Sequence, residues 1–119
     1  MCGIGRTTHL CLEAAEQLSA ADIDAEVIDV LTLNPLDEDT IIESVRRTHR
    51  LVVVDEDTPV ASVARDIAAR AADLAFEYLD APIKTVTSVD TPVPFSAVLE
   101  AAYAPRVEQV VATVRAMLG

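Results

Sequence analysis

The fold of this chain is decided by residues 51–57, which read Leu-Val-Val-Val-Asp-Glu-Asp. A strand with one face in water alternates apolar and polar side chains, and this stretch does not. Its unbroken apolar run, rich in β-branched residues, is typical of an inner strand of a parallel sheet that helices cover on both faces. The three acids then mark the point where the strand leaves the core.

The flanking sequence supplies elements that can pair with this strand or cover it. The stub of a first strand ends at Ile4, and further strands are predicted over 25–30 and 83–87. Helical periodicity predicts helices over 8–21, 37–47, 60–78 and 107–118. The third of these helices is expected to bury Val63, Ile67, Ala71, Leu74 and Tyr78.

This order of elements determines the expected architecture. It reads β-α-β-α-β-α-β-α, which predicts one domain, residues 1–119, built as a three-layer α/β/α sandwich with a mainly parallel sheet. Residues 91–95 contain two prolines, which lack backbone N–H groups, so this segment is expected to cross the surface in an extended form.

The helix ends carry recognisable signals. Thr7 or Thr8 is the expected N-cap of the first helix, and Asp37 is expected to cap the second. His49 stands where the chain leaves the second helix, a position that often requires a left-handed backbone.

The charge of the chain limits its partners. It carries 20 acidic and nine basic residues, a formal net charge of -11, and Lys84 is its only lysine. Such a surface repels nucleic acid and anionic membranes, so it favours a basic protein as a partner. Solvation of the chain and adaptation to high salt are alternative roles for the acids.

The cysteines do not indicate a disulfide framework or a zinc site, because Cys2 and Cys11 are too few and wrongly spaced. Cys11 lies on the apolar stripe of the first helix and is expected in the core, whereas Cys2 is expected to be exposed. No apolar stretch has the length of a membrane span, and the first residues lack the regions of a signal peptide. A cytoplasmic protein with reduced thiols is expected.

One local pattern suggests a nucleotide. Residues 3–5 read Gly-Ile-Gly before a helix, and Asp29 ends the next strand more than twenty residues later. In dinucleotide-binding folds such glycines admit a pyrophosphate and the acid holds a ribose hydroxyl. Thr8 occupies the third glycine position, and similar features occur in many βαβ units. A small nucleotide-binding domain therefore remains an alternative.

The other polar residues do not form a recognised catalytic pattern. Asp55, Glu56 and Asp57 fit either a hard cation or, as we favour, the positive end of the following helix. His9 and His49 stand far apart in the sequence and beside no nucleophile, so local hydrogen bonding is expected of both. The sequence therefore indicates no catalytic, cofactor-binding or metal-binding residue.

Three longer patterns are more specific. The first pairs residues 9–15, His-Leu-Cys-Leu-Glu-Ala-Ala, with residues 26–37, Glu-Val-Ile-Asp-Val-Leu-Thr-Leu-Asn-Pro-Leu-Asp. The second is Arg-Leu-Val-Val-Val-Asp-Glu at 50–56. The third runs from Tyr-Leu-Asp-Ala-Pro-Ile-Lys at 78–84 to Asp-Thr-Pro-Val-Pro-Phe-Ser at 90–96.

In this order and spacing, nearly the whole chain resembles the C-terminal domain of the β subunit of thiamine-diphosphate-dependent 2-oxo acid dehydrogenases. The pyruvate, branched-chain and acetoin E1 components carry this domain, which has the transketolase C-terminal domain fold. The resemblance implies a five-stranded mixed sheet with one antiparallel strand. It also implies that thiamine diphosphate and Mg²⁺ bind elsewhere in E1, so the isolated chain is expected to be inactive.

The resemblance further implies a role in assembly and docking. The expected partners are the E1 α subunit, a second β subunit and the basic subunit-binding domain of the acyltransferase E2. By position, the residues expected to contact E2 are Glu77, Asp80, Leu118 and Gly119. The complete enzyme would oxidatively decarboxylate a 2-oxo acid and acylate the lipoyl groups of E2.

The sequence also departs from the family pattern. The family usually begins this domain with a full strand before the glycine, and only residues 1–4 remain here, so a fragment or a standalone reading frame is expected. Residues 60–64, Val-Ala-Ser-Val-Ala, replace common glycines in the acetoin and branched-chain style, and His49 also replaces one. A standalone, self-associating interaction module therefore remains a second alternative.

Overall fold

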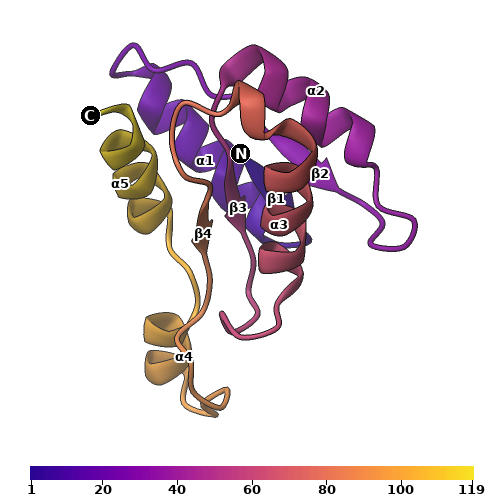
Figure 1. The fold of residues 1–119 in the computed structure, drawn as a ribbon. Coiled ribbons are helices and arrows are strands. Elements are labelled where there is room, and N and C mark those ends of the chain that lie inside the picture. The colour runs from indigo at the N-terminus through magenta and orange to yellow at the C-terminus, as the bar shows by residue number, and fades with distance from the viewer.

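The apolar run at the centre of the sequence forms an inner strand of a parallel sheet. In the computed structural model, which describes all residues 1–119, the strand order is β2-β1-β3-β4 (Figure 1). The strands are β1 (Cys2–Ile4), β2 (Ile28–Val30), β3 (Val52–Val54) and β4 (Lys84–Val86), and every pairing is parallel. The three valines of β3 are at most 3% exposed, as the sequence predicts for a strand covered on both faces.

Helices cover both faces of this sheet, which confirms the three-layer sandwich. On one face α1 (Thr7–Ser19) packs against α5 (Val107–Leu118), and on the other α2 (Glu38–Thr48) packs against α3 (Val63–Ala75). A single turn of 3₁₀ helix, η1 (Phe76–Tyr78), follows α3, and α4 (Ala97–Tyr103) lies apart from both layers in Figure 1.

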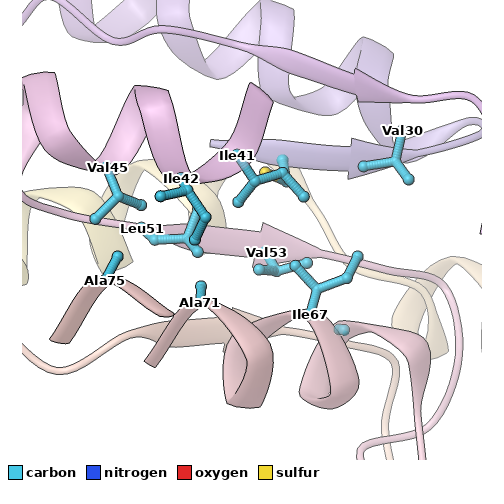
Figure 2. Packing of buried hydrophobic residues seen from close by; sticks show 11 residues of the cluster. Val30, Ile41, Ile42, Val45, Leu51, Val53, Ile67, Ala71 and Ala75 are labelled. Carbon is cyan, nitrogen blue, oxygen red and sulfur yellow. The ribbon is translucent and has the colours of Figure 1, made fainter. Parts of the chain in front are cut away.

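The alternation of side chains along β3 divides the apolar interior into two clusters. Val53 points toward α2 and α3, where it packs with Ile41, Val45 and Ile67 (Figure 2). Val52 and Val54 point the other way, into a cluster built mainly from α1 and α5. The strand β3 therefore contributes aliphatic side chains to the buried clusters on both faces of the sheet.

The strand count differs from the expectation. The sheet has four strands where the family resemblance implied five, and it contains no antiparallel strand. After β4 the chain passes through residues 91–95, where Pro92 and Pro94 lack the N–H groups that pairing with β4 requires. This segment is almost entirely exposed and forms no strand, as expected of a surface crossing rich in proline.

Several local predictions are confirmed. The side chain of Asp37 accepts a hydrogen bond from the backbone N–H of Thr40 at 3.2 Å and so caps α2. His49 ends this helix with a φ of 62°, in the left-handed region. Cys11 is fully buried in the α1/α5 cluster.

Other local predictions are wrong. Cys2 is fully buried, because β1 is an inner strand and its side chain lies in the α2/α3 cluster. The expected helix over 60–78 starts only at Val63, since Ala61 has a φ of 54° and Ser62 is the N-cap. Leu74 is 50% exposed and does not belong to the buried stripe.

Candidate functional site

The carboxyl edge of the sheet holds the residues of the glycine pattern, and they contact one another. A Cβ atom on Gly3 would lie 2.5 Å from the Cα of Thr8, so glycine is needed for the close approach of β1 and α1. The hydroxyl of Thr8 donates a hydrogen bond to Oδ1 of Asp29 at 2.8 Å. Both halves of the apparent nucleotide fingerprint thus have structural partners inside the fold.

Thr7 joins three elements at the same edge, a role that the sequence did not reveal. It is fully buried, and its hydroxyl lies 2.7 Å from the carbonyl oxygen of Val54 and 2.9 Å from that of Ile4. The hydroxyl also accepts a hydrogen bond from the backbone N–H of Ile4 at 2.8 Å. Neither Thr7 nor Thr8 caps α1, whose N-cap is Arg6 without a side-chain bond.

The three acids after β3 form local contacts, and they do not point toward a common site. Oδ1 of Asp55 accepts a hydrogen bond from the backbone N–H of Asp57, and Oδ1 of Asp57 accepts one from Thr58. Glu56 forms an ion pair with Arg6 at 2.7 Å. No group of three or more potential ligands is placed to hold a metal ion.

The histidines and cysteines also lack reactive surroundings. Nδ1 of His49 lies 2.8 Å from the carbonyl oxygen of Tyr78, a contact that links the end of α2 to η1. His9 is exposed on α1. Burial raises the pKa of the Cys2 and Cys11 thiols to about 11, so both remain protonated and unreactive at neutral pH.

The four residues expected to contact E2 lie at the opposite, amino edge of the sheet. Glu77 belongs to η1, and the backbone N–H of Asp80 donates to the carbonyl of His49 at 2.9 Å. Leu118 ends α5 and is 42% exposed, and Gly119 follows it.

Two features connect the two halves of this set. Nε of Arg50 donates to the carbonyl of Met117 at 3.4 Å, so the segment after His49 reaches the end of α5. Leu118 lines a cavity of about 320 Å³ together with Arg50 and Leu51. The structure therefore places the four residues along one edge, and no hydrogen bond or ion pair joins the η1 pair to the α5 pair.

A further feature, which the sequence reading missed, is the segment 89–103, here called the arm. It contains the exposed apolar residues Val89 (52%), Val93 (63%), Phe95 (107%), Val98 (79%) and Leu99 (59%). No residue of α4 is buried. In Figure 1 the arm projects beyond the carboxyl ends of the strands, away from the helical layers.

The arm is anchored only at its base. The backbone N–H of Val89 donates to the carbonyl of Tyr103 at 3.2 Å, which closes the arm on itself. Ser88, just before it, donates its backbone N–H to Asp57 at 3.0 Å. The many apolar residues over 93–99 were the signal in the sequence for an apolar surface here. Whether their side chains are exposed depends on which elements of the chain cover them, and the sequence does not show this.

None of the helices combines the length and the apolar content that a bilayer crossing requires.

Comparison with known proteins identifies the family. The model of the transketolase C-terminal domain matches residues 1–110. The β subunit of acetoin:2,6-dichlorophenolindophenol oxidoreductase from Bacillus subtilis is 49% identical over 98% of this chain and 34% of its own length. The β subunit of the pyruvate dehydrogenase E1 component from Rhizobium meliloti is 47% identical over 97% of this chain and 25% of its own length.

A solved structure supports the same assignment. It is described as a split gene transketolase, inactive beta4 tetramer, and aligns with 98% of this chain and 37% of its own at a TM-score of 0.77 and 29% identity. The chain thus spans between a quarter and about a third of the length of the two curated relatives named above. It belongs to the transketolase C-terminal domain family and is similar to the β subunits of a pyruvate dehydrogenase E1 component and of an acetoin oxidoreductase.

Proposed function

We propose that residues 1–119 form one assembly domain of the β subunit of an E1 enzyme from a 2-oxo acid dehydrogenase complex of the pyruvate, branched-chain or acetoin type. That enzyme would oxidatively decarboxylate its substrate and acylate the lipoyl groups of E2. The observation that carries the proposal is the arm, which exposes five large apolar side chains within 11 residues, whereas both faces of the inner strand β3 are buried in the two apolar clusters.

The physical reason is the cost of leaving such a surface in water. Each large apolar side chain that becomes buried contributes about 1.5–3 kcal/mol, and the arm presents five of them. Exposed apolar patches of this kind mark protein contacts. We therefore assign the arm to the contact with the E1 α subunit or with another part of a β subunit.

We infer that the residues of this chain do not hold thiamine diphosphate or Mg²⁺. Gly3 is needed for the close approach of β1 and α1, and Thr8 already binds Asp29, so both have roles within the fold itself. The acids after β3 bond to neighbouring backbone N–H groups and to Arg6. We propose that the cofactor binds to other parts of E1, and we assign no catalytic residue here.

The test is co-purification of the chain with an E1 α subunit and the remaining part of the β subunit. A double variant, Phe95→Ser with Leu99→Ser, is expected to reduce recovery of the complex at least tenfold. The matched control is Leu31→Ser, which changes a leucine that is 85% exposed but lies outside the arm. Equal recovery of the complex with the wild type, the double variant and the Leu31→Ser control would refute the assignment of the arm.

A second contact, docking of E2, is proposed for Glu77, Asp80, Leu118 and Gly119. Neither acid forms an ion pair within the chain, so both remain free for a basic partner. Reversal of one such charge at the rim of an interface lowers affinity and changes its dependence on salt.

The test for this contact is the affinity for the subunit-binding domain of E2. We expect Asp80→Lys to weaken it by about tenfold, or about 1.4 kcal/mol. Glu13→Lys makes the same charge change on the exposed surface of α1 and serves as the control. If Asp80→Lys and the wild type bound E2 with equal affinity, the proposed E2 contact at the amino edge would be refuted. We further propose a cytoplasmic location for the complex.

A further inference from the structure

The acids of this chain are mostly unpaired. Five of the 20 form ion pairs, all with arginine, which leaves 15 without a cation within 4 Å. Of those 15 only Asp55 is buried, and the others are exposed. A net charge of -11 on a 12.7 kDa protein destabilises the folded state through repulsion, because folding brings these carboxylates closer together.

The core that must overcome this repulsion consists of small side chains. Valine and alanine make up 13 of the 21 buried apolar residues, and none of the 21 is aromatic. Around Val53, for example, α3 contributes Ala64, Ala71 and Ala75 beside a single isoleucine, Ile67. Such side chains remove less apolar area from water than leucine or phenylalanine would, so each contributes less stability.

Salt acts favourably on both features. It screens repulsion between exposed charges, with a Debye length of about 10 Å at 0.1 M that falls to about 3 Å at 1 M. Salts such as sulfate and phosphate also strengthen the burial of apolar groups, because they are excluded from protein surfaces. Salt is therefore expected to stabilise this fold in two ways, by screening the repulsion between its acids and by strengthening the burial of its small apolar side chains.

We propose that this domain is built to fold and work at molar salt, and that its stability falls steeply at low ionic strength. This goes beyond the assembly role, and it bears on which contact dominates assembly. At about 1 M salt the charges of Glu77 and Asp80 are screened within about 3 Å, so long-range attraction of a basic partner is weak. The apolar arm gains strength under the same conditions.

The experiment follows thermal unfolding of the chain alone, by circular dichroism, at increasing KCl. We expect the Tm to rise by about 10 °C or more between about 0.1 M and 2 M, and to continue rising above 0.5 M. At equal ionic strength, potassium sulfate should raise it further than KCl. A Tm that changes by less than about 3 °C, or stops rising below 0.5 M, would overturn the proposal.

A variant with fewer acids isolates the repulsion. Glu13→Gln, Glu16→Gln, Asp73→Asn and Glu108→Gln remove four exposed carboxylates that form no ion pair. The matched control keeps the charge at the same sites, with Glu13→Asp, Glu16→Asp, Asp73→Glu and Glu108→Asp. The neutral variant should have a higher Tm than the control at about 0.1 M salt and a smaller gain on adding KCl.

The outcomes of this comparison are distinct. Equal salt dependence of the two variants would show that repulsion between these acids is not responsible, and it would contradict the proposal. The measurement uses no E1 or E2 partner. Its result therefore does not affect the binding tests of the arm and of the amino edge, and the two kinds of failure can be told apart.

Discussion

The packed body of this domain, residues 1–88 and 104–119, and the arm, residues 89–103, differ in how their apolar side chains are used. In the body, both faces of β3 are covered, and Val53 and Val54 are 0% exposed. In the arm, Phe95 is 107% exposed and no residue of α4 is fully buried. The difference indicates that the body specifies its own fold, whereas the arm presents a surface whose burial requires another polypeptide.

The largest effect we expect separates the two regions directly. Ile67 is 1% exposed between α3 and the sheet, so Ile67→Ala should cost about 2–5 kcal/mol of unfolding free energy through lost burial and a cavity. Phe95→Ala removes a larger side chain but should change the stability of the isolated chain by less than about 0.5 kcal/mol.

Urea unfolding of both variants, at a salt concentration where the wild type is folded, checks this pair. If Phe95→Ala were as destabilising as Ile67→Ala, the arm would have to be packed within the chain, and the contrast between the regions would be wrong.

The next effect concerns the polar junction inside the body. Thr7→Val keeps the shape of the side chain but removes the hydroxyl that bonds to the backbone of Ile4 and Val54. Unpaired buried groups remain, so we expect a loss of about 1–3 kcal/mol in unfolding free energy. Thr7→Ser retains the hydroxyl and is the control. A Thr7→Val variant as stable as the wild type would show that the hydroxyl does not stabilise this junction.

The sequence predicted the body better than the arm, and it predicted local features better than distant contacts. The inner strand, the Asp37 cap and the left-handed His49 all depend on residues close in the sequence, and all are confirmed. Thr7 binds a carbonyl 47 residues away, which no local pattern reveals. Burial of Cys2 likewise follows from strand order, which places β1 between β2 and β3.

The candidate site shows the same limit. Glu77 and Asp80 were predicted to contact E2 through the family resemblance, and that role stays a prediction, although both side chains are exposed. Within the arm, the sequence predicted only an extended crossing over residues 91–95, because the exposure of Val98 and Leu99 depends on the absence of a covering element.

A smaller effect compares helix caps in the two regions. The side chain of Ser62 accepts a hydrogen bond from the backbone N–H of Arg65 at 3.3 Å and caps α3, whereas Ser96 precedes α4 without such a bond. Ser62→Ala should therefore lower the unfolding free energy by about 1 kcal/mol. Ser96→Ala should leave it unchanged within error. Equal Tm values for the two variants would contradict the reading of Ser62 as a cap.

The smallest effect is a pH dependence in the body. The hydrogen bond from Ser44, together with the hydrogen bond and the charge of Arg47, lowers the pKa of Glu26 below its ordinary value of 4.5. The folded state therefore favours the ionised carboxyl, which contributes stability above the unfolded pKa. This contribution is lost as the pH falls through the folded pKa.

Glu26→Gln should therefore reduce the loss of Tm between about pH 5 and pH 3, while the two proteins differ by a constant amount near pH 7. Asp37→Asn tests a second lowered pKa, caused by the side chain and backbone of Thr40, and provides a comparison. An unchanged slope for Glu26→Gln below pH 4.5 would show that this carboxyl does not contribute to acid unfolding.

The most direct test of the central claim is hydrogen exchange of the wild-type chain, measured alone and within an assembled E1. In the free chain, amides of β3 should be strongly protected and those of the arm should exchange close to unstructured rates. On assembly, exchange in the arm should slow by at least tenfold while β3 stays unchanged. An arm that is already as protected as β3 in the free chain, or that stays unprotected in E1, would contradict the account.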